Sequence, residues 1–257
     1  MNPTSINLNA DLGESFGAWR MGDDAALLRV IGSANIACGF HAGDPVVMRE
    51  TVRLALANGV SLGAHPAFPD LQGFGRRAMQ LSVKELEATI LYQVGALQAM
   101  AAAEGGRVTH VKPHGALNNI ACADANVAAT VARAVRALDR ELILLAPALS
   151  ALEAAGEAAG LRVGREVFAD RSYQADGQLT PRSQPGAVLH DAQACVQHVL
   201  RMLDAGGIVT ADGQRLPTPI HSICVHGDGP DAVASAQQIR LALEKAGFQL
   251  APLTALV

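Results

Sequence analysis

The sequence lacks the features that nucleic-acid binding or membrane insertion requires. Its 20 lysine and arginine residues do not exceed its 24 acidic residues, and the formal net charge is -4. There is thus no basic excess to attract a phosphate backbone or anionic lipids. No apolar run approaches the roughly 18 residues of a membrane-spanning helix, and no basic region followed by an apolar run opens the chain. We expect a soluble, cytoplasmic protein with no nucleic-acid or membrane partner.

Cysteines and aromatic residues are also scarce. The four cysteines are scattered without a CxxC pair, which excludes a disulfide framework and a structural zinc pattern. Cys38 and Cys224 lie within apolar runs and are predicted to be core residues, not nucleophiles. Aromatic residues make up only 4% of the chain, so the core must be mostly aliphatic.

Short β-rich runs alternate with longer helical patterns along the 257 residues, which favours βαβ units and a parallel sheet. The length and the 50% hydrophobic content suit one large α/β domain spanning residues 1–257. We predict a barrel of seven or eight mainly parallel strands. The candidate strands are Ser5–Asn9, Ser33–Cys38, Ser61–Ala64, Val108–Lys112, Leu142–Ala146, Arg162–Phe168, Ser222–Val225 and Phe248–Ala251.

Helix signals separate these strands. Asp44 followed by Pro45 predicts a capped helix that runs to Asn58-Gly59. Ser82 to Glu85 matches a capping box, and it predicts a long helix that ends before Gly105-Gly106. Further helices are predicted to begin near Asp124, Leu149, Asp191 and Pro230.

Two segments fit neither pattern. Residues 66–80 and 170–189 are rich in glycine, proline, aspartate and arginine. Loops of this length in a compact domain are usually functional, so we expect both to border a site.

Nearly every candidate strand is followed by polar residues. In parallel α/β folds, sites are built at the carboxyl ends of strands, so these side chains should meet at one mouth. Histidine, carboxylate and lysine side chains together supply proton donors, proton acceptors and positive charge, which indicates an enzyme. The residues concerned are Asn9, Asp11, Glu14, His41, His65, His110, Lys112, His114, Glu166, Asp170, Arg171, His226 and Asp228.

Several of these polar residues have a structural alternative. A strand-end histidine is commonly only a hydrogen-bonded structural group, and Asp44, Asp124 and Asp191 are predicted to be helix caps. Period-2 alternation places Lys112 inside the barrel or at its rim, where it needs an anionic partner or substrate. Arg76-Arg77 and Arg171 fit equally well as surface charge or as clamps for carboxylate and phosphate.

The standard nucleotide and protease motifs are absent. The sequence contains no P-loop, no dinucleotide-binding G-x-G-x-x-G at a helix start and no H-E-x-x-H. Ser15 lies in a G-x-S-x-G match, but no earlier strand exists to supply an oxyanion hole, so a turn or a cap is predicted. Local spacing predicts no metal ligands, although the fold is free to bring Asp11, His41, His65 and His226 together.

Six motifs of this chain resemble the LamB/YcsF family. The resemblance covers essentially the whole chain with the motifs in order. They are Asn9–Ser15, Ala34–Pro45, Gly63–Pro66, Val111–Leu117, Glu166–Arg171 and Val225–Asp228.

The resemblance implies a distorted TIM-like (β/α) barrel similar to glycoside hydrolase/deacetylase barrels. Members of the family are known as the A subunits of 5-oxoprolinase. The implied reaction converts 5-oxoproline, ATP and water to glutamate, ADP and phosphate, together with subunits B and C. ATP is a cosubstrate that partner subunits could bind, and a divalent metal such as Mg could accompany it. Homo-oligomer formation is left open.

As a mechanistic hypothesis, Asp11 or Glu14 activates water, His65 or His114 donates a proton to the leaving nitrogen, and Lys112 stabilises oxyanionic charge. The predicted substrate-binding residues are Asn9, His41, Arg76, Glu166, Asp170, Arg171, His226 and Asp228.

Two alternatives to this function remain open. One is a metal-dependent deacetylase or amidohydrolase, and the other is a non-catalytic substrate-binding protein whose partners perform the chemistry.

Overall fold

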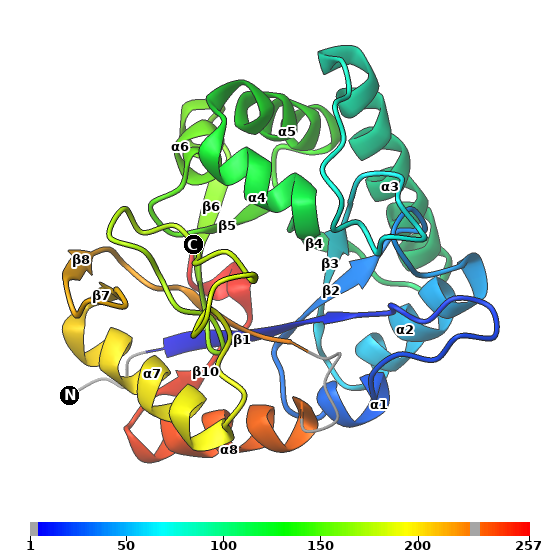
Figure 1. The fold of residues 1–257 in the computed structure, drawn as a ribbon. Coiled ribbons are helices and arrows are strands. Elements are labelled where there is room, and N and C mark those ends of the chain that lie inside the picture. The colour runs from blue at the N-terminus through cyan, green and yellow to red at the C-terminus, as the bar shows by residue number, and fades with distance from the viewer. Residues whose placement is uncertain (1–4, 227–231) are drawn as a thin grey trace.

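Seven parallel strands close into a barrel (Figure 1). The computed structural model describes residues 5–226 and 232–257. Closure depends on the first strand, which pairs in parallel with both the second and the last strand of the barrel. In order around the barrel the strands are β1 (Ser5–Leu12), β2 (Ser33–Ala37), β3 (Ser61–His65), β4 (Val108–Val111), β5 (Ile143–Pro147), β6 (Arg162–Phe168) and β9 (Ser222–Val225).

Within residues 5–226 and 232–257, three short strands lie outside the closed ring. β10 (Gln249–Leu250) extends the sheet in parallel beside the beginning of β1. β7 (Gly207–Val209) and β8 (Arg215–Pro217) form an antiparallel hairpin between the last two barrel strands in the chain. The architecture is therefore the predicted α/β barrel, with seven barrel strands and one parallel extension.

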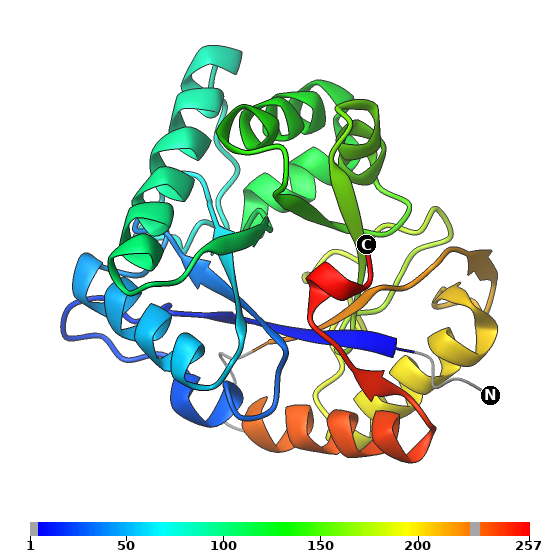
Figure 2. The same cartoon turned by 180° about the vertical axis from the view of Figure 1, so that it is seen from behind.

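Helices surround the barrel on its outer side (Figures 1 and 2). The main apolar core lies between these helices and the outward-facing side chains of the strands. The helices are α1 (Asp24–Leu27), α2 (Pro45–Ala57), α3 (Val83–Ala103), α4 (Gly115–Ala123), α5 (Ala125–Leu138), α6 (Ala151–Ala158), α7 (Ala192–Ala205), α8 (Ala232–Lys245) and the 3-10 turn η1 (Leu253–Ala255).

Alternation along β1 separates the two sides of the barrel wall. Ile6 and Leu8 belong to the apolar core outside the wall. Asn7, Asn9 and Asp11 point the other way and hydrogen-bond to side chains of neighbouring strands across the interior. The barrel is consequently filled with paired polar groups, as burial requires.

The amino-terminal end of the barrel is closed by apolar side chains. Ile143 and Leu145 of β5 form a small buried cluster with Leu253 of η1. Figure 2 shows the red C-terminal segment lying against this end of the barrel. The polar residues that follow the strands therefore lie at the end opposite to this apolar plug.

Most predicted elements are confirmed, with differences at their ends. Arg162–Phe168 and Ser222–Val225 have the predicted bounds. β1 is three residues longer than predicted, because its last residues pair with β2. The short strands β7 and β8 and the helices α1 and α4 were not predicted, since none has a long periodic pattern.

The predicted caps are present. Asp44, Asp124 and Asp191 each accept hydrogen bonds from the first backbone amides of α2, α5 and α7. Ser82 and Glu85 form the reciprocal capping box of α3. Ser15 accepts a hydrogen bond from the backbone amide of Met21 and so closes a turn, one of the two structural roles predicted for it.

None of the helices within the described ranges has both the length and the apolar character that crossing a bilayer requires.

Candidate active site

A cavity of about 580 Å³ opens at the carboxyl ends of the barrel strands. Its lining comes from residues at or just after the carboxyl ends of β1, β3, β4, β5, β6 and β9 and from the two long loops. The predicted site residues that line it are Asp11, Glu14, His65, Arg76, Lys112, His114, Arg171 and His226. The strand-end residues thus meet at one mouth, as their positions in the sequence predict.

Lys112 lies between two carboxylates at the floor of the cavity. Its Nζ atom is 3.1 Å from Asp11 Oδ1 and 3.0 Å from Glu166 Oε1. Glu166 is fully buried, and only 3% of the lysine side chain is exposed. Lys112 therefore has the anionic partners that its predicted position inside the barrel required.

The protonation of this cluster follows from its charges. Burial favours a neutral amine, but Asp11, Cys224 and Glu166, in that order, outweigh it and hold the pKa of Lys112 well above its usual value. Burial also opposes ionisation of Asp11, but His65 and Lys112 outweigh it and lower the pKa of Asp11 well below its usual range. For Glu166 burial dominates and raises the pKa. Asp11 is the more strongly ionised of the two acids.

A polar layer supports Lys112 and Asp11 from within the barrel. Asn35 donates to both Asn9 Oδ1 and Asp11 Oδ1, at 2.8 and 2.9 Å. His110 Nε2 lies 3.0 Å from Asn35 Oδ1, and burial lowers the pKa of His110 to about 3. His110 is therefore a neutral ring that donates to the asparagine and fixes its orientation. A Cβ atom at Gly63 would collide with this ring, so glycine is needed there.

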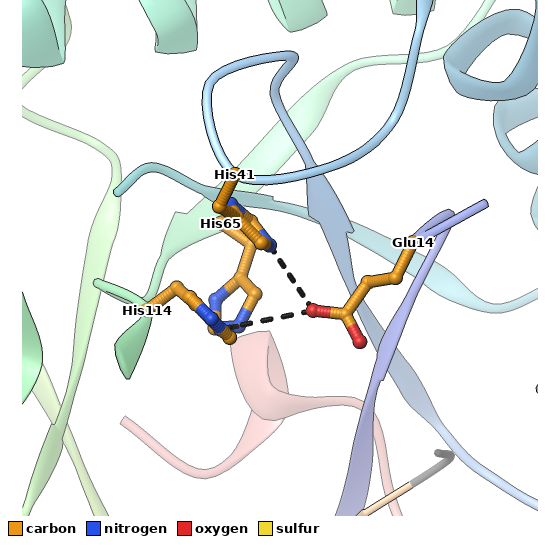
Figure 3. Close-up of side chains that lie close together, drawn as sticks. All are labelled: Glu14, His41, His65 and His114. Atoms are coloured by element: carbon orange, nitrogen blue, oxygen red, sulfur yellow. Dashed lines mark hydrogen bonds and ion pairs between the residues drawn. The ribbon is translucent and has the colours of Figure 1, made fainter. Parts of the chain in front are cut away.

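Glu14 and three histidines form a compact cluster on one side of the cavity (Figure 3). His41 Nε2 lies 3.1 Å from Glu14 Oε1, and His114 Nδ1 lies 3.7 Å from the same oxygen. The rings of His41 and His114 stack with 3.9 Å between centroids, and His65 lies edge-on to both. Burial lowers the pKa of His41 and of His114 well below the usual value.

Backbone carbonyls orient two of these rings. His65 Nδ1 lies 2.7 Å from the carbonyl oxygen of Lys112. His114 Nε2 lies 2.8 Å from the carbonyl oxygen of Phe74, whose ring also packs edge-on against His41 and His114. The loop of residues 66–80 therefore borders the site, as its length predicts.

The second long loop borders the opposite side of the cavity. Asp170 and His226 form an ion pair in which both carboxylate oxygens lie 2.8 Å from the ring Nδ1. Burial favours the neutral ring, but Asp170 outweighs it and raises the pKa of His226. Arg171 lines the cavity, while its Nε and Nη2 atoms donate to the carbonyls of Ala187 and Thr180 within the same loop.

Among the residues that the structure describes, two groups of side chains are close enough to hold a metal ion, although local spacing predicts no metal ligands. One group is Glu14, His41, His65 and His114, and the other is Asp11, Cys224 and His226. The predicted combination of Asp11, His41, His65 and His226 is divided between these two groups.

The family follows from a match over nearly the entire chain. The model described as the LamB/YcsF family matches residues 6–257. The chain belongs to the LamB/YcsF family. This confirms the resemblance carried by the six sequence motifs.

Two relatives show how similar the family members are. The chain is 67% identical over 245 residues to a protein of Azoarcus sp. (strain BH72) named as the A subunit of 5-oxoprolinase, and the match covers 95% of this chain and 96% of that protein. The crystal structure of a "lactam utilization protein" from Thermus thermophilus is 45% identical, with a TM-score of 0.91 over 97% of this chain and 100% of that one.

A more distant neighbour supports the fold alone. The structure of a "T48 deacetylase with substrate" is 15% identical, with a TM-score of 0.51 over 98% of this chain and 92% of that one. The predicted similarity to deacetylase barrels is confirmed at the level of the fold.

The remaining predicted residues do not line the cavity but contact residues that do. Asn9 and Glu166 contact Lys112 from the barrel interior, and His41 lies behind Glu14. Asp170 lies behind His226. Asp228 falls outside the described residues.

Sequence reasoning missed two residues of the site. Arg182 lines the cavity, and its Nη2 atom lies 3.5 Å from His226 Nε2. Its place in the glycine- and proline-rich loop was the available signal. Cys224 was predicted to be a core residue and is fully buried, but its Sγ atom also lies 3.1 Å from Lys112 Nζ. Burial raises the pKa of Cys224 well above its usual value, so it is a neutral thiol.

Proposed function

We propose that this chain is the A subunit of a cytoplasmic, ATP-dependent 5-oxoprolinase that opens the lactam of 5-oxo-L-proline to give L-glutamate. The observation that carries the proposal is the 67% identity, over 95% of the chain, to a protein that bears this name. The name of that relative supports partner subunits, which we take to be B and C. The site of this chain supports a hydrolytic role in such an assembly.

The cavity suits a small anionic substrate. Arg76, Arg171 and Arg182 line it together with Lys112, so positive charge surrounds the space. Guanidinium groups bind carboxylate and phosphate through paired donors, and both groups occur in this reaction. We assign the arginines to the carboxylate of 5-oxoproline and to the phosphoryl group that activates it.

Activation by ATP precedes ring opening in the proposed reaction. The γ-phosphoryl group is transferred to the lactam oxygen, the lactam nitrogen loses its proton, and ADP leaves. Water then adds across the activated C=N bond, so that the carbon gains a hydroxyl group and the nitrogen gains a proton. The C–N bond breaks as the nitrogen gains a second proton and the hydroxyl loses its own to become the carbonyl of the acyl phosphate. The product, γ-glutamyl phosphate, is hydrolysed by a second water to glutamate and phosphate. ATP is required because an unactivated amide is inert at neutral pH.

Asp11 is the proposed base for the first water. It lines the cavity, and the ammonium group of Lys112, 3.1 Å away, favours its ionised form. A carboxylate with a lowered pKa is a weak base, which suffices for a carbon that phosphorylation has already activated. Lys112 acts as a positioning residue because its charge keeps Asp11 ionised and fixed in place.

His226 is the proposed acid for the leaving nitrogen. Its ring lines the cavity with a nitrogen within 4.8 Å of an Asp11 oxygen, and Asp170 raises its pKa, so the imidazolium can donate a proton near neutrality. We prefer His226 to His114 for this role, because burial lowers the pKa of His114 well below the useful range.

The nucleotide is assigned to the partner subunits. The sequence has no P-loop, and the cavity is already occupied by the activated lactam in this scheme. We propose that ATP binds with Mg²⁺ at a site completed by subunits B and C.

The test is the release of glutamate from 5-oxoproline by this chain alone, by subunits B and C alone, and by all three together, with and without ATP. We expect glutamate only from the full mixture with ATP. Release by this chain without ATP would replace the proposal with the amidohydrolase alternative.

Variants of this chain, assayed together with subunits B and C, distinguish a catalytic role from a role in substrate binding alone. His226→Gln and Asp11→Asn should each lower kcat by about 100-fold or more, as expected when general acid–base catalysis is lost. His190→Gln is the matched control, because His190 is exposed and lies outside the cavity lining. Normal kcat in the first two variants would instead indicate a chain that only binds substrate.

A further inference from the structure

The tautomers of His65 and His114 follow from their backbone partners. A carbonyl oxygen only accepts hydrogen bonds, so His65 Nδ1 and His114 Nε2 must each carry the hydrogen that they donate. A ring that carries only this one hydrogen has a lone pair on its other nitrogen. These nitrogens, His65 Nε2 and His114 Nδ1, point towards one another in the cluster of Figure 3.

The two lone pairs create a conflict that a cation would remove. His65 Nε2 and His114 Nδ1 lie 3.0 Å apart, and when each ring carries a single hydrogen neither of these nitrogens has one to donate to the other. A third acceptor, Asp11 Oδ2, lies 3.3 Å from His65 Nε2. A shared proton would place a positive charge on rings that are 1% and 6% exposed, with a third ring stacked at 3.9 Å. A metal ion bound by both nitrogens needs no ring protonation, and His65 and His114 would be held by backbone carbonyls, the usual support for metal-binding histidines.

Glu14 and His41 complete a ligand set of suitable size. The separations between donor atoms are 3.0 Å for His65–His114, 3.1 Å for His41–Glu14 and 3.7 Å for His114–Glu14. Tetrahedral zinc with bonds of about 2.0–2.1 Å has ligand atoms about 3.3 Å apart. One donor atom from each of the four residues lies within 4.8 Å of every other.

The other candidate group is electrostatically unsuited to a cation. Lys112 Nζ lies 3.1 Å from Asp11 Oδ1 and 3.1 Å from Cys224 Sγ. A metal ion bound by Asp11, Cys224 and His226 would lie against this ammonium group. The cluster with Glu14 also has a cation near it, because the charge of Arg76 helps to lower the pKa of His41. This cluster is favoured by its fourth ligand and by the two rings that backbone carbonyls orient.

We propose that Glu14, His41, His65 and His114 bind a divalent transition-metal ion, with zinc as the best match. Three imidazoles and one carboxylate suit zinc, whereas magnesium and calcium prefer oxygen ligands. This site is distinct from the magnesium that accompanies ATP. Glu14, His65 and His114 line the cavity, so the bound ion would be accessible from it.

Direct metal binding tests the proposal without substrate, ATP or partner subunits. Untagged chain is stripped with a chelator, titrated with zinc by calorimetry, and analysed for zinc after gel filtration. Stripped chain is also titrated with Co²⁺, whose visible absorption reports coordination by nitrogen and oxygen. We expect one zinc per chain, a zinc-dependent rise in Tm and an intense Co²⁺ spectrum.

Variants locate the ion. His41→Gln and His114→Gln should each lower zinc affinity by about 10-fold or more and weaken the Co²⁺ spectrum. His226→Gln, from the rejected group, and His190→Gln, on the surface, should keep the affinity of the natural chain. Far-UV circular dichroism of each stripped variant checks that it folds.

Three results would overturn the proposal. The first is a folded natural chain that retains no zinc. The second is unchanged affinity in both His41→Gln and His114→Gln, and the third is loss of binding in His226→Gln. If no metal binds, ¹⁵N NMR of the ring nitrogens would show a proton shared by His65 and His114, which identifies the alternative. Because glutamate release is not measured, failure here leaves the proposed lactam chemistry to its own test.

Discussion

The ammonium group of Lys112 pairs with two carboxylates at the floor of the cavity. Its ammonium group lies within 3.1 Å of one oxygen from each of Asp11 and Glu166, and neither the lysine nor Glu166 is open to water. Removing one partner of a buried ion pair leaves the other charge uncompensated, which costs far more than the pair itself contributes.

Lys112→Met should lower the free energy of unfolding by about 3–5 kcal/mol at pH 7, because two carboxylates then lack a cation. The loss should shrink as the pH falls. Burial raises the pKa of Glu166, so the folded variant takes up a proton at a higher pH than the unfolded chain, and acid restores stability. Urea unfolding at pH 7 and pH 5 measures both effects.

Two variants control this experiment. The double variant Lys112→Met/Glu166→Gln removes one of the two carboxylates that lack a cation. It should recover part of the free energy of unfolding at pH 7. Lys84→Met changes an exposed lysine and should alter stability by less than about 0.5 kcal/mol. If Lys112→Met is as stable as the natural chain at pH 7, the ion-pair account of the floor is wrong.

At the scale of elements, α2 connects a helix cap to the site. Asp44 Oδ1 accepts from the amides of Val46 and Val47, 2.8 and 3.1 Å away, and so caps the helix. Its Oδ2 accepts from the amide of Gly17 at 2.7 Å. Gly17 belongs to the segment that follows Glu14, so one carboxylate caps α2 and anchors the segment that carries a cavity residue.

Asp44→Ala should lower stability by about 1–2 kcal/mol through the lost cap and should also lower zinc affinity through Glu14. Hydrogen bonds from Gly17 and Val47 lower the pKa of Asp44, so its contribution is present at neutral pH and lost as the pH falls through the folded pKa. The stability difference from the natural chain should therefore narrow in acid. Urea unfolding and zinc calorimetry measure the two effects.

Ser82→Ala is the matched control because Ser82 caps α3 and is exposed at a position outside the cavity lining. It should lose about 1 kcal/mol of stability and keep the natural zinc affinity. Equal effects of the two caps on zinc affinity would contradict the anchoring role of Asp44.

At the scale of the whole molecule, the apolar residues that close the barrel and the polar residues of the candidate site lie at opposite ends of the barrel. The mouth is polar and carries the cavity, while Leu253 closes the other end against Ile143 and Leu145. In (β/α) barrels the carboxyl ends of the strands serve function, and the opposite face serves stability.

Leu253→Ala should lower the free energy of unfolding by about 2–5 kcal/mol, because it leaves a cavity at the closed end of the barrel. Turnover and zinc affinity of the folded fraction should not change. Leu241→Ala, at a position that is 63% exposed, should change stability by less than about 0.5 kcal/mol. A changed KM with unchanged stability would show that the two ends are coupled.

Much of the fold was predictable because its rules are local. Proline after Asp44 and the pair Ser82–Glu85 marked helix starts, and both caps are present. Elements without such signals, including α4 after His114 and the hairpin of β7 and β8, were missed.

Convergence at the mouth was also predictable from the sequence. Parallel strands bring their carboxyl ends together whatever their order, so the polar residues that follow them had to meet. The sequence alone therefore determined the fold class, the family and the end of the barrel that carries the site.

Only the tertiary structure decided how these residues pair. The partners of Lys112 come from β1 and β6, which are far from it in the chain, and the closed barrel brings them together. The tautomers of His65 and His114 depend on carbonyls that lie 47 and 40 residues away in sequence. Protonation and ligand geometry arise from distances between segments, and no local pattern in the sequence records those distances.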